Sequence, residues 1–277
     1  MRKVMLMAAP NGARKTKADH PALPLTAQEL ADTARDCMEA GASAIHLHAR
    51  DETGAHTLEP AHYLPLMKAV RAATGGELNI QITTEAVGRY GPAEQMACVR
   101  ATLPQAASLA LKELAPDDEA ETLERARGFF RWLSVMGISP QFILYSPEDV
   151  RRFSRLRADG VIPFARPFVL MVLGRYAENG ESEPEELDAY VEALGDVPAH
   201  WAVCAFGRKE ARAALRAARL GGHARIGFEN NDRLPDGRLA PDNAVLMAAT
   251  RDVLEREGFA LMTTAEARAL LAEASKC

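Results

Sequence analysis

Two histidines separated by one residue are the strongest chemical signal in the sequence. His46 and His48 lie at the end of a short apolar run, and side chains two residues apart on a β-strand point to the same face. Near the end of the chain, Arg225, Gly227 and Glu229 alternate in the same way through another apolar run. Two imidazoles and a carboxylate with a fourth position open are the ligands of a catalytic zinc. The same set also suits iron(II).

A structural role and a different class of metal hydrolase both fit the histidine pair less well. A single histidine on a strand is usually a core residue whose ring nitrogens are hydrogen-bonded. A His-x-His pair with a carboxylate in the matching layer of the barrel is unusual for such a structural role. Amidohydrolase-type barrels also use His-x-His, yet they add histidines from middle strands. No histidine occurs between His62 and His200, which argues against that class.

Short apolar runs alternate with longer amphipathic segments along the chain, which predicts the elements that position these residues. We expect strands at residues 3–9, 44–48, 78–83, 106–111, 141–145, 168–173, 200–206 and 224–228. We expect helices at 26–40, 119–135, 147–158, 183–193, 209–220 and 242–257. Thr26 with Glu29 three residues later is a capping-box pattern for the first helix.

Eight strands alternating with helices indicate an α/β protein with a parallel sheet, and specifically a (β/α)8 TIM barrel formed by one domain over residues 1–277. No G-x-G-x-x-G follows the first strand, which disfavours a doubly wound fold. Strands 2 and 8 contribute to the same interior layers of a barrel. His46, His48 and Glu229 are therefore expected to meet where the strands end.

Composition narrows the possible partners and the compartment. The 33 Lys and Arg residues against 38 Asp and Glu give a net charge of −5, which disfavours general binding to nucleic acid or to acidic membranes.

No apolar run approaches the ~20 residues that span a bilayer. The apolar stretch at 4–9 is too short for a signal peptide. The four cysteines have no C-x-x-C spacing, so we expect a cytoplasmic protein with reduced thiols.

Several blocks of sequence carry a specific family resemblance. They are AAPNGAR at 8–14, PLTAQELADTARDCMEAGASAIHLHARDETG at 24–54, QITTE at 81–85, GGHARIGFENN at 221–231 and LAPDNA at 239–244. In these blocks the chain resembles the beta-keto acid cleavage enzymes, of which the 3-keto-5-aminohexanoate cleavage enzymes are examples. The resemblance implies a zinc-dependent reaction of a β-keto acid with acetyl-CoA that gives acetoacetate and a new acyl-CoA. It also implies a homotetramer.

The resemblance assigns roles to residues at the strand ends. Zinc at His46, His48 and Glu229 would polarise the keto group, and Arg225 would stabilise the oxyanion of the adduct. Neutral hydrogen bonds would come from Asn11 and Thr83. Further substrate-binding candidates are Arg14, Thr84 and Ser108. The basic pair Arg208 and Lys209 would meet CoA phosphates after the seventh strand, although two charges at a helix start are usually just solvated.

The sequence also departs from the family pattern. Asn230 stands where the family commonly has an acid–base aspartate, and an amide cannot take that proton at neutral pH. Arg14 replaces a frequent acidic residue, Thr84-Glu85-Ala86 replaces Thr-Gly-Gly, and the segment 141–145 lacks the expected acidic residues. We hypothesise that Glu85 takes over the acid–base role. Arg14 and Glu85 would form a coupled pair, or divide the two ends of a polar substrate between them.

Two alternatives to this function remain at the level of sequence. One is a metal-dependent C–C lyase or hydrolase that uses no CoA. The other is a metal-binding family member without catalytic activity, which the loss of a base at Asn230 would favour.

Overall fold

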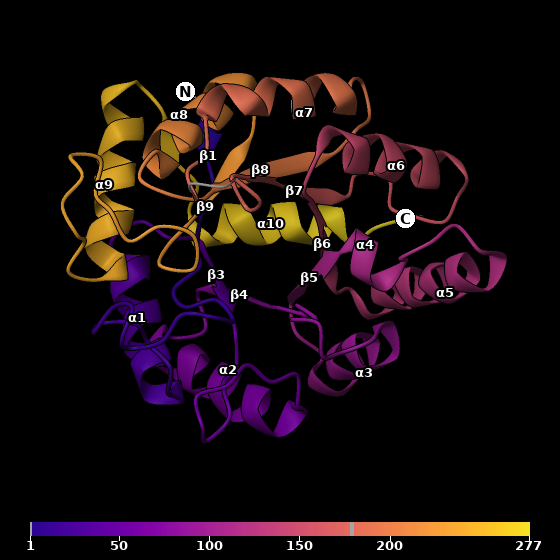
Figure 1. Cartoon of the computed structure of the whole chain (residues 1–277), viewed down its shortest axis with the longest axis horizontal. Coiled ribbons are helices and arrows are strands. Elements are labelled where there is room, and N and C mark those ends of the chain that lie inside the picture. Colours follow the sequence, from indigo (N-terminus) through magenta and orange to yellow (C-terminus); the bar gives the residue numbers. More distant parts are fainter. Residues whose placement is uncertain (1, 178–179) are drawn as a thin grey trace.

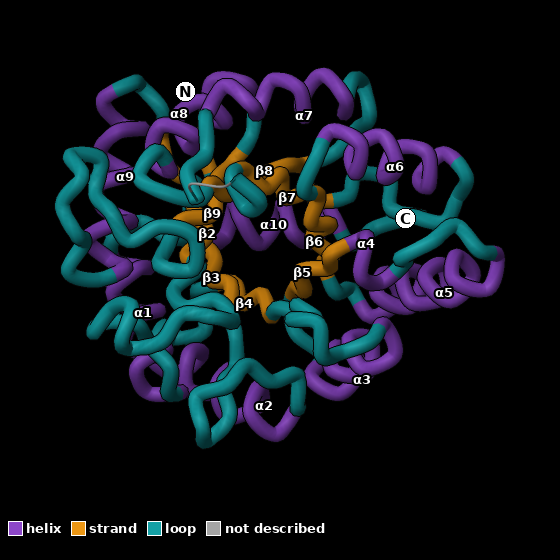
Figure 2. The backbone as a smooth tube through the Cα atoms, viewed as in Figure 1, coloured by secondary structure: helices purple, strands orange, loops and turns teal. Residues whose placement is uncertain are grey.

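Eight short strands form a closed parallel barrel in the computed structural model, which describes residues 2–177 and 180–277. The strands follow one another around the barrel in sequence order (Figure 2). They are β2 (Leu6–Ala8), β3 (Ala44–Leu47), β4 (Asn79–Ile82), β5 (Ala106–Ala110), β6 (Ser139–Leu144), β7 (Phe168–Leu173), β8 (His200–Ala205) and β9 (His223–Ile226). The barrel closes where Met7 of β2 pairs with Arg225 of β9. The predicted (β/α)8 barrel is confirmed.

Helices surround the barrel, because parallel neighbours must be joined by crossovers that return outside the sheet (Figure 1). The predicted helical segments are present with ends shifted by a few residues: α1 (Ala27–Glu39), α5 (Ala120–Met136), α6 (Pro147–Ala158), η1 (Pro184–Glu186) with α7 (Leu187–Leu194), α8 (Glu210–Leu220) and α9 (Asn243–Arg256). The capping box predicted for α1 forms, since Thr26 and Glu29 bond each other's backbone N–H. None of the helices within the described ranges has the length and apolarity to cross a bilayer.

The sequence-based prediction omits four helices and one short strand. The helices are α2 (Pro60–Ala73), α3 (Pro92–Thr102), the single turn α4 (Leu111–Leu114) and α10 (Thr264–Ala274), and the strand is β10 (Ala260–Leu261). Pro65 lies inside α2, and α3 buries Gln95 as well as Cys98 and Val99. Neither helix therefore shows a clean apolar stripe in its sequence.

The predicted first strand, residues 3–9, is in fact two strands. Its first part, β1 (Lys3–Val4), pairs with β10 outside the barrel, and only β2 joins the barrel. Helix α10 lies across the end of the barrel at which the strands begin (Figure 1). There Ala267 and Leu270 pack with Met5 in a small apolar cluster. The βα loops gather at the opposite end.

Alternation along the strands separates an apolar shell from a more polar interior. Ile45 and Leu47 of β3 and Ile226 of β9 belong to the large apolar cluster between the barrel and its helices. The residues between them in sequence, His46 and Arg225, are buried and face the interior. This period-two pattern sends the chemically active side chains into the barrel mouth.

Candidate active site

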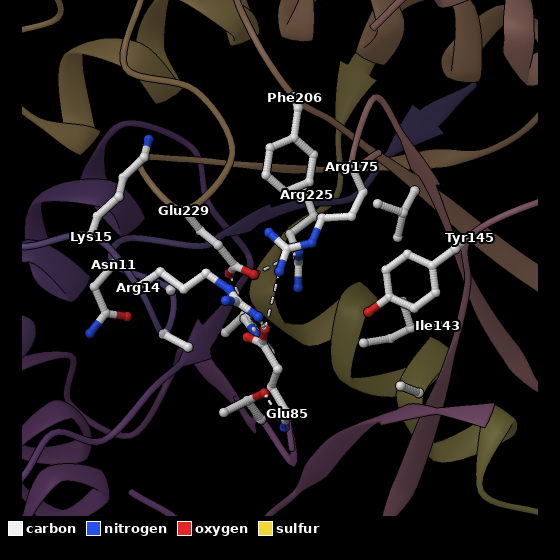
Figure 3. A pocket seen from close by; sticks show the side chains of 16 residues that line it. Asn11, Arg14, Lys15, Glu85, Ile143, Tyr145, Arg175, Phe206, Arg225 and Glu229 are labelled. Atoms are coloured by element: carbon white, nitrogen blue, oxygen red, sulfur yellow. Dashed lines mark hydrogen bonds and ion pairs between the residues drawn. The ribbon is translucent and has the colours of Figure 1, made fainter. Parts of the chain in front are cut away.

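A pocket of about 620 Å³, open to solvent, lies where the strands end. Its polar lining comprises Asn11, Arg14, Lys15, His46, Thr83, Glu85, Tyr145, Arg175, Arg225 and Glu229, and its larger apolar side chains are Ile143, Val172 and Phe206. In Figure 3, charged side chains converge on the centre of this pocket. Barrel enzymes place their active sites at this end.

Three potential metal ligands, His46, His48 and Glu229, lie close together, and two of them, His46 and Glu229, line the pocket. His46 Nε2 lies 3.0 Å from His48 Nε2, and Glu229 Oε2 lies 3.6 Å from the first and 3.5 Å from the second. Ligands held tetrahedrally at 2.0–2.1 Å from a zinc ion are about 3.3 Å apart. The three atoms therefore already have the spacing of a first coordination shell.

Hydrogen bonding determines which atoms present lone pairs to this point. His46 Nδ1 lies 2.7 Å from the amide oxygen of Gln81, whose amide nitrogen donates to Gln141. An amide oxygen only accepts, so the proton of His46 is on Nδ1 and its Nε2 presents a lone pair. Glu229 Oε2 is buried and has no hydrogen-bond partner among the described residues. A divalent cation is the group that fits between such atoms.

Burial keeps both imidazoles neutral, which is the form that binds metals. Desolvation, followed by the nearby charge of Arg225, holds the pKa of His46 well below its ordinary value. Desolvation, followed by repulsion from His56, does the same to the pKa of His48. The donor set of two neutral imidazoles and one carboxylate fits zinc or iron(II).

Arg225 is buried directly beside the ligand carboxylate. Its Nη2 donates to Glu229 Oε1 over 3.0 Å and lies 3.3 Å from Asn230 Oδ1 and 3.5 Å from Cys204 Sγ. Burial opposes the charged guanidinium, but the carboxylate of Glu229 outweighs it and raises the pKa of Arg225. A fixed positive charge therefore lies next to the metal-ligand cluster and lines the pocket.

Asn11 and Thr83 both line the pocket, as the sequence predicts. The Asn11 amide nitrogen donates to the His48 carbonyl over 3.0 Å, while its buried oxygen Oδ1 has no partner in the described part of the chain. The Thr83 hydroxyl accepts from the Glu85 backbone N–H over 3.0 Å. Asn11 thus offers a hydrogen-bond acceptor, and Thr83 orients the start of the loop that carries Glu85.

Glu85 is paired with two arginines over the metal-ligand cluster. Its Oε1 lies 3.7 Å from Arg14 Nη2 and 3.4 Å from Arg175 Nη2, and its Oε2 lies 4.0 Å from His48 Nδ1. His56 Nε2 is 2.9 Å from the Glu85 carbonyl and holds the backbone there. The structure contains the Arg14–Glu85 pair that the sequence suggested, with Arg175 as a third member.

Other predicted site residues lie outside the pocket lining. The Thr84 hydroxyl donates to the Ser108 carbonyl over 2.8 Å, and both residues are buried in the barrel wall. Asn230 is also buried, and it contacts Arg225 rather than the pocket. Lys209 pairs with Glu183, and Arg208 lies 3.9 Å from Glu181. These carboxylates flank the start of α8, which opposes the binding of CoA phosphates at that point.

Sequence reasoning missed several residues that shape the pocket. Arg175 and Tyr145 are pocket residues at or beyond the predicted ends of their strands, and no spacing rule marked them. Two buried ionisable side chains also hold its loops. Arg50 Nη2 donates to the carbonyls of Gly12 (2.6 Å) and Lys15 (3.0 Å). The Glu210 carboxyl accepts from Gly227 N (3.2 Å) and from the Asn231 side chain (3.1 Å).

Gly12 makes a close approach to the ligand carboxylate. Its φ is +65°, and a Cβ added there would lie 2.7 Å from Glu229 Cγ. A side chain at this position would therefore be strained and would also displace Glu229.

Comparison with known proteins places the chain among enzymes of one kind. The family described as beta-keto acid cleavage enzyme matches residues 3–272. The 3-oxoadipate:acetyl-CoA acetyltransferase of Cupriavidus necator is 28% identical, over 96% of this chain and 94% of that protein. The 3-keto-5-aminohexanoate cleavage enzyme of Fusobacterium nucleatum is also 28% identical, over 98% of both chains.

A solved structure shows the same fold. The apo structure of ObcA superposes with a TM-score of 0.71 at 17% identity, and the match covers 91% of this chain but 65% of that one. The described chain thus spans about two thirds of the length of ObcA and shares its barrel.

Proposed function

The chain belongs to the beta-keto acid cleavage enzyme family, and from that membership and the pocket we propose that it is a metal-dependent enzyme that converts a β-keto acid and acetyl-CoA into acetoacetate and a new acyl-CoA. The acyl group of the keto acid moves to the CoA thiol, and the acetyl group takes its place. The reaction is balanced without an oxidant or reductant. We further propose zinc as the metal and a cytoplasmic homotetramer as the native form, the latter testable by light scattering.

The observation that carries the proposal is the ligand cluster of His46, His48 and Glu229, whose donor atoms lie 3.0–3.6 Å apart and open into the pocket beside a buried arginine. These residues would hold the metal. When bound, it would supply Lewis-acid polarisation of the keto oxygen.

Arg225 would stabilise the negative charge that develops on the oxygen of the tetrahedral adduct. It is held in place by Glu229 and Asn230 before substrate arrives, so its charge need not be reorganised during the reaction. Asn11 would orient the substrate through its unpaired Oδ1, which accepts a hydrogen bond.

Glu85 is our candidate for the proton-transfer group. Apart from the metal ligand Glu229, Glu85 is the only carboxylate among the described residues that line the pocket. Asn230, at the position where the family commonly has an acid–base aspartate, carries an amide in place of a carboxylate. Glu85→Gln preserves the shape and removes the charge. We expect it to lower turnover by about 100-fold or more without loss of bound metal, because general acid–base groups contribute about 10²–10⁴-fold. Turnover equal to wild type would exclude Glu85 from this role.

The function is tested by incubating zinc-loaded protein with a panel of β-keto acids, with and without acetyl-CoA, and identifying products by mass spectrometry. Formation of acetoacetate that requires acetyl-CoA, together with a matching acyl-CoA, supports the proposal. Turnover without acetyl-CoA would instead indicate a lyase or hydrolase. Binding of keto acid without turnover would indicate a non-catalytic family member, the alternative that Asn230 favours.

A further inference from the structure

The pocket carries more positive charge than a simple β-keto acid requires. Its described lining contains the cations Arg14, Lys15, Arg175 and Arg225 against the carboxylates Glu85 and Glu229, and a divalent metal would add two further charges. A β-keto acid with an uncharged tail brings one negative charge. This imbalance favours a ligand with an additional anionic group.

Two of the four cations already have other partners. Arg225 is bonded to Glu229 and Asn230, and Lys15 Nζ donates to the Phe228 carbonyl over 2.7 Å. In Figure 3 Lys15 extends away from the centre of the pocket. The excess positive charge therefore lies mainly at Arg14 and Arg175.

Among the described residues, Arg14 and Arg175 share one carboxylate, that of Glu85, and make only loose contact with it. They approach the same oxygen of Glu85 at 3.7 and 3.4 Å, although each guanidinium carries five N–H donors. The Arg14 side chain is 62% exposed and the Arg175 side chain 25% exposed. Their arrangement around Glu85 shows that two guanidinium groups from different loops can meet at one carboxylate position.

The backbone around Arg14 and the side chain of Arg175 are both held by neighbouring residues. The bonds from buried Arg50 to the Gly12 and Lys15 carbonyls bracket Arg14 on both sides. Arg175 lies over the ring of Phe206, with its Cζ 5.4 Å from the ring centroid. Arg175 is thus the more fixed of the pair, while Arg14 starts from a fixed backbone and is free to close over a ligand.

Resting on the proposed function, we propose that the substrate is a β-keto acid with a second carboxylate at the end remote from the reacting keto group, and that Arg14 and Arg175 bind this carboxylate. Ile143, Val172 and Phe206 offer an apolar surface for the methylene groups between the two ends. A substrate ending in an ammonium group would face two guanidinium groups and would be repelled.

The test compares three β-keto acids of similar length at saturating acetyl-CoA. They end in a carboxylate (3-oxoadipate), a methyl group (3-oxohexanoate) and an ammonium group (3-keto-5-aminohexanoate). We expect kcat/KM for the dicarboxylate to exceed that for the neutral acid by about 10- to 100-fold, the range for a charge-assisted hydrogen-bonded pair. Arg14→Ala and Arg175→Ala should each reduce this ratio at least fivefold, and Arg14→Glu should shift it toward the ammonium substrate.

Arg89→Ala is the matched control. This exposed arginine follows the same barrel end but is not in the pocket lining, and it stacks on Tyr90. It should leave the ratio unchanged. The proposal would be overturned if the wild-type kcat/KM values for the dicarboxylate and the neutral acid differ by less than threefold. It would also be overturned if Arg14→Glu leaves their ratio unchanged.

Two further measurements distinguish a failure of this inference from a failure of the proposed function. Calorimetry of the dicarboxylate and the neutral acid with zinc-loaded protein reports the preference even if no keto acid reacts with acetyl-CoA. That outcome would reject the proposed function and still decide the role of Arg14. If Arg14→Ala instead raises KM for acetyl-CoA, but not for its phosphate-free N-acetylcysteamine analogue, the anion is a CoA phosphate and the carboxylate assignment is wrong.

Discussion

Gly12→Ala should displace the ligand Glu229 and so weaken metal binding, although the substitution removes no polar group. Gly12 has φ +65°, and the added Cβ would lie 2.7 Å from Glu229 Cγ. Carbon atoms pack at about 3.5–4.0 Å, so Glu229 or the loop must move by about 1 Å. The left-handed backbone adds about 1–2 kcal/mol of destabilisation.

A shift of this size should lower zinc affinity about 10- to 100-fold, as loss of supporting interactions around metal ligands does. It should also lower turnover by about 100-fold. Zinc affinity is measured by competition with a chromophoric chelator, and stability by urea unfolding of the metal-free protein.

Gly137→Ala provides the matched control. Gly137 ends α5 with φ +66°, and an added Cβ would meet nothing within 4 Å. This variant should lose a similar 1–2 kcal/mol of stability while keeping wild-type zinc affinity and turnover. If Gly12→Ala binds zinc within threefold of Gly137→Ala, the close packing of Gly12 on Glu229 does not position the ligand, and the reasoning is refuted.

Three further predictions follow from the site. His48→Ala should abolish stoichiometric zinc in elemental analysis while circular dichroism stays that of a folded barrel; one retained zinc per chain would refute the ligand assignment. Arg225→Lys keeps the positive charge but loses the planar, forked set of N–H donors of the guanidinium, so kcat should fall far more than KM rises. A change confined to KM would instead make Arg225 a substrate-binding residue. Burial raises the pKa of Glu210 from its ordinary 4.5 to about 8. The contribution of Glu210 to the free energy of unfolding is therefore fully present below pH 4.5 and is lost as the pH rises through 8. Unfolding free energies at pH 6 and 9 should differ less in Glu210→Gln than in the wild type, and an equal difference would contradict this.

The barrel and its ligand cluster were predictable because both depend on simple periodicities. Alternation on two strands sends His46 and Arg225 inward, and the carboxyl ends of barrel strands share one edge. Neither inference needs knowledge of the loops. The ligand atoms consequently meet as the parity argument requires.

The remainder of the pocket depends on loop conformations that no period describes. Arg175 lies in the turn just after β7, and its Nη2 comes within 3.4 Å of Glu85, which follows β4; no spacing rule predicts that pairing. The hydroxyl of Thr84, which was a candidate for substrate binding, instead donates to the Ser108 carbonyl, and the sequence does not show that partner. The charges of Arg208 and Lys209 alone suggest a phosphate site, but their partners Glu181 and Glu183 lie more than 20 residues away in the sequence, so local sequence does not show the pairing.

The ligand cluster has a consequence for how long the folded chain persists. Strand β2 is the seam of the barrel: it pairs with β3 on one side and β9 on the other through two or three residue pairs each. His46 and His48 come from β3 and its end, and Glu229 follows β9, so a bound ion would fasten together the two strands that flank this seam. Such a cross-link between remote parts of the chain acts as a disulfide does across a long loop, by restricting the opened state. Metal loading would then slow unfolding of the barrel, and the site that binds substrate would also govern the protein's lifetime.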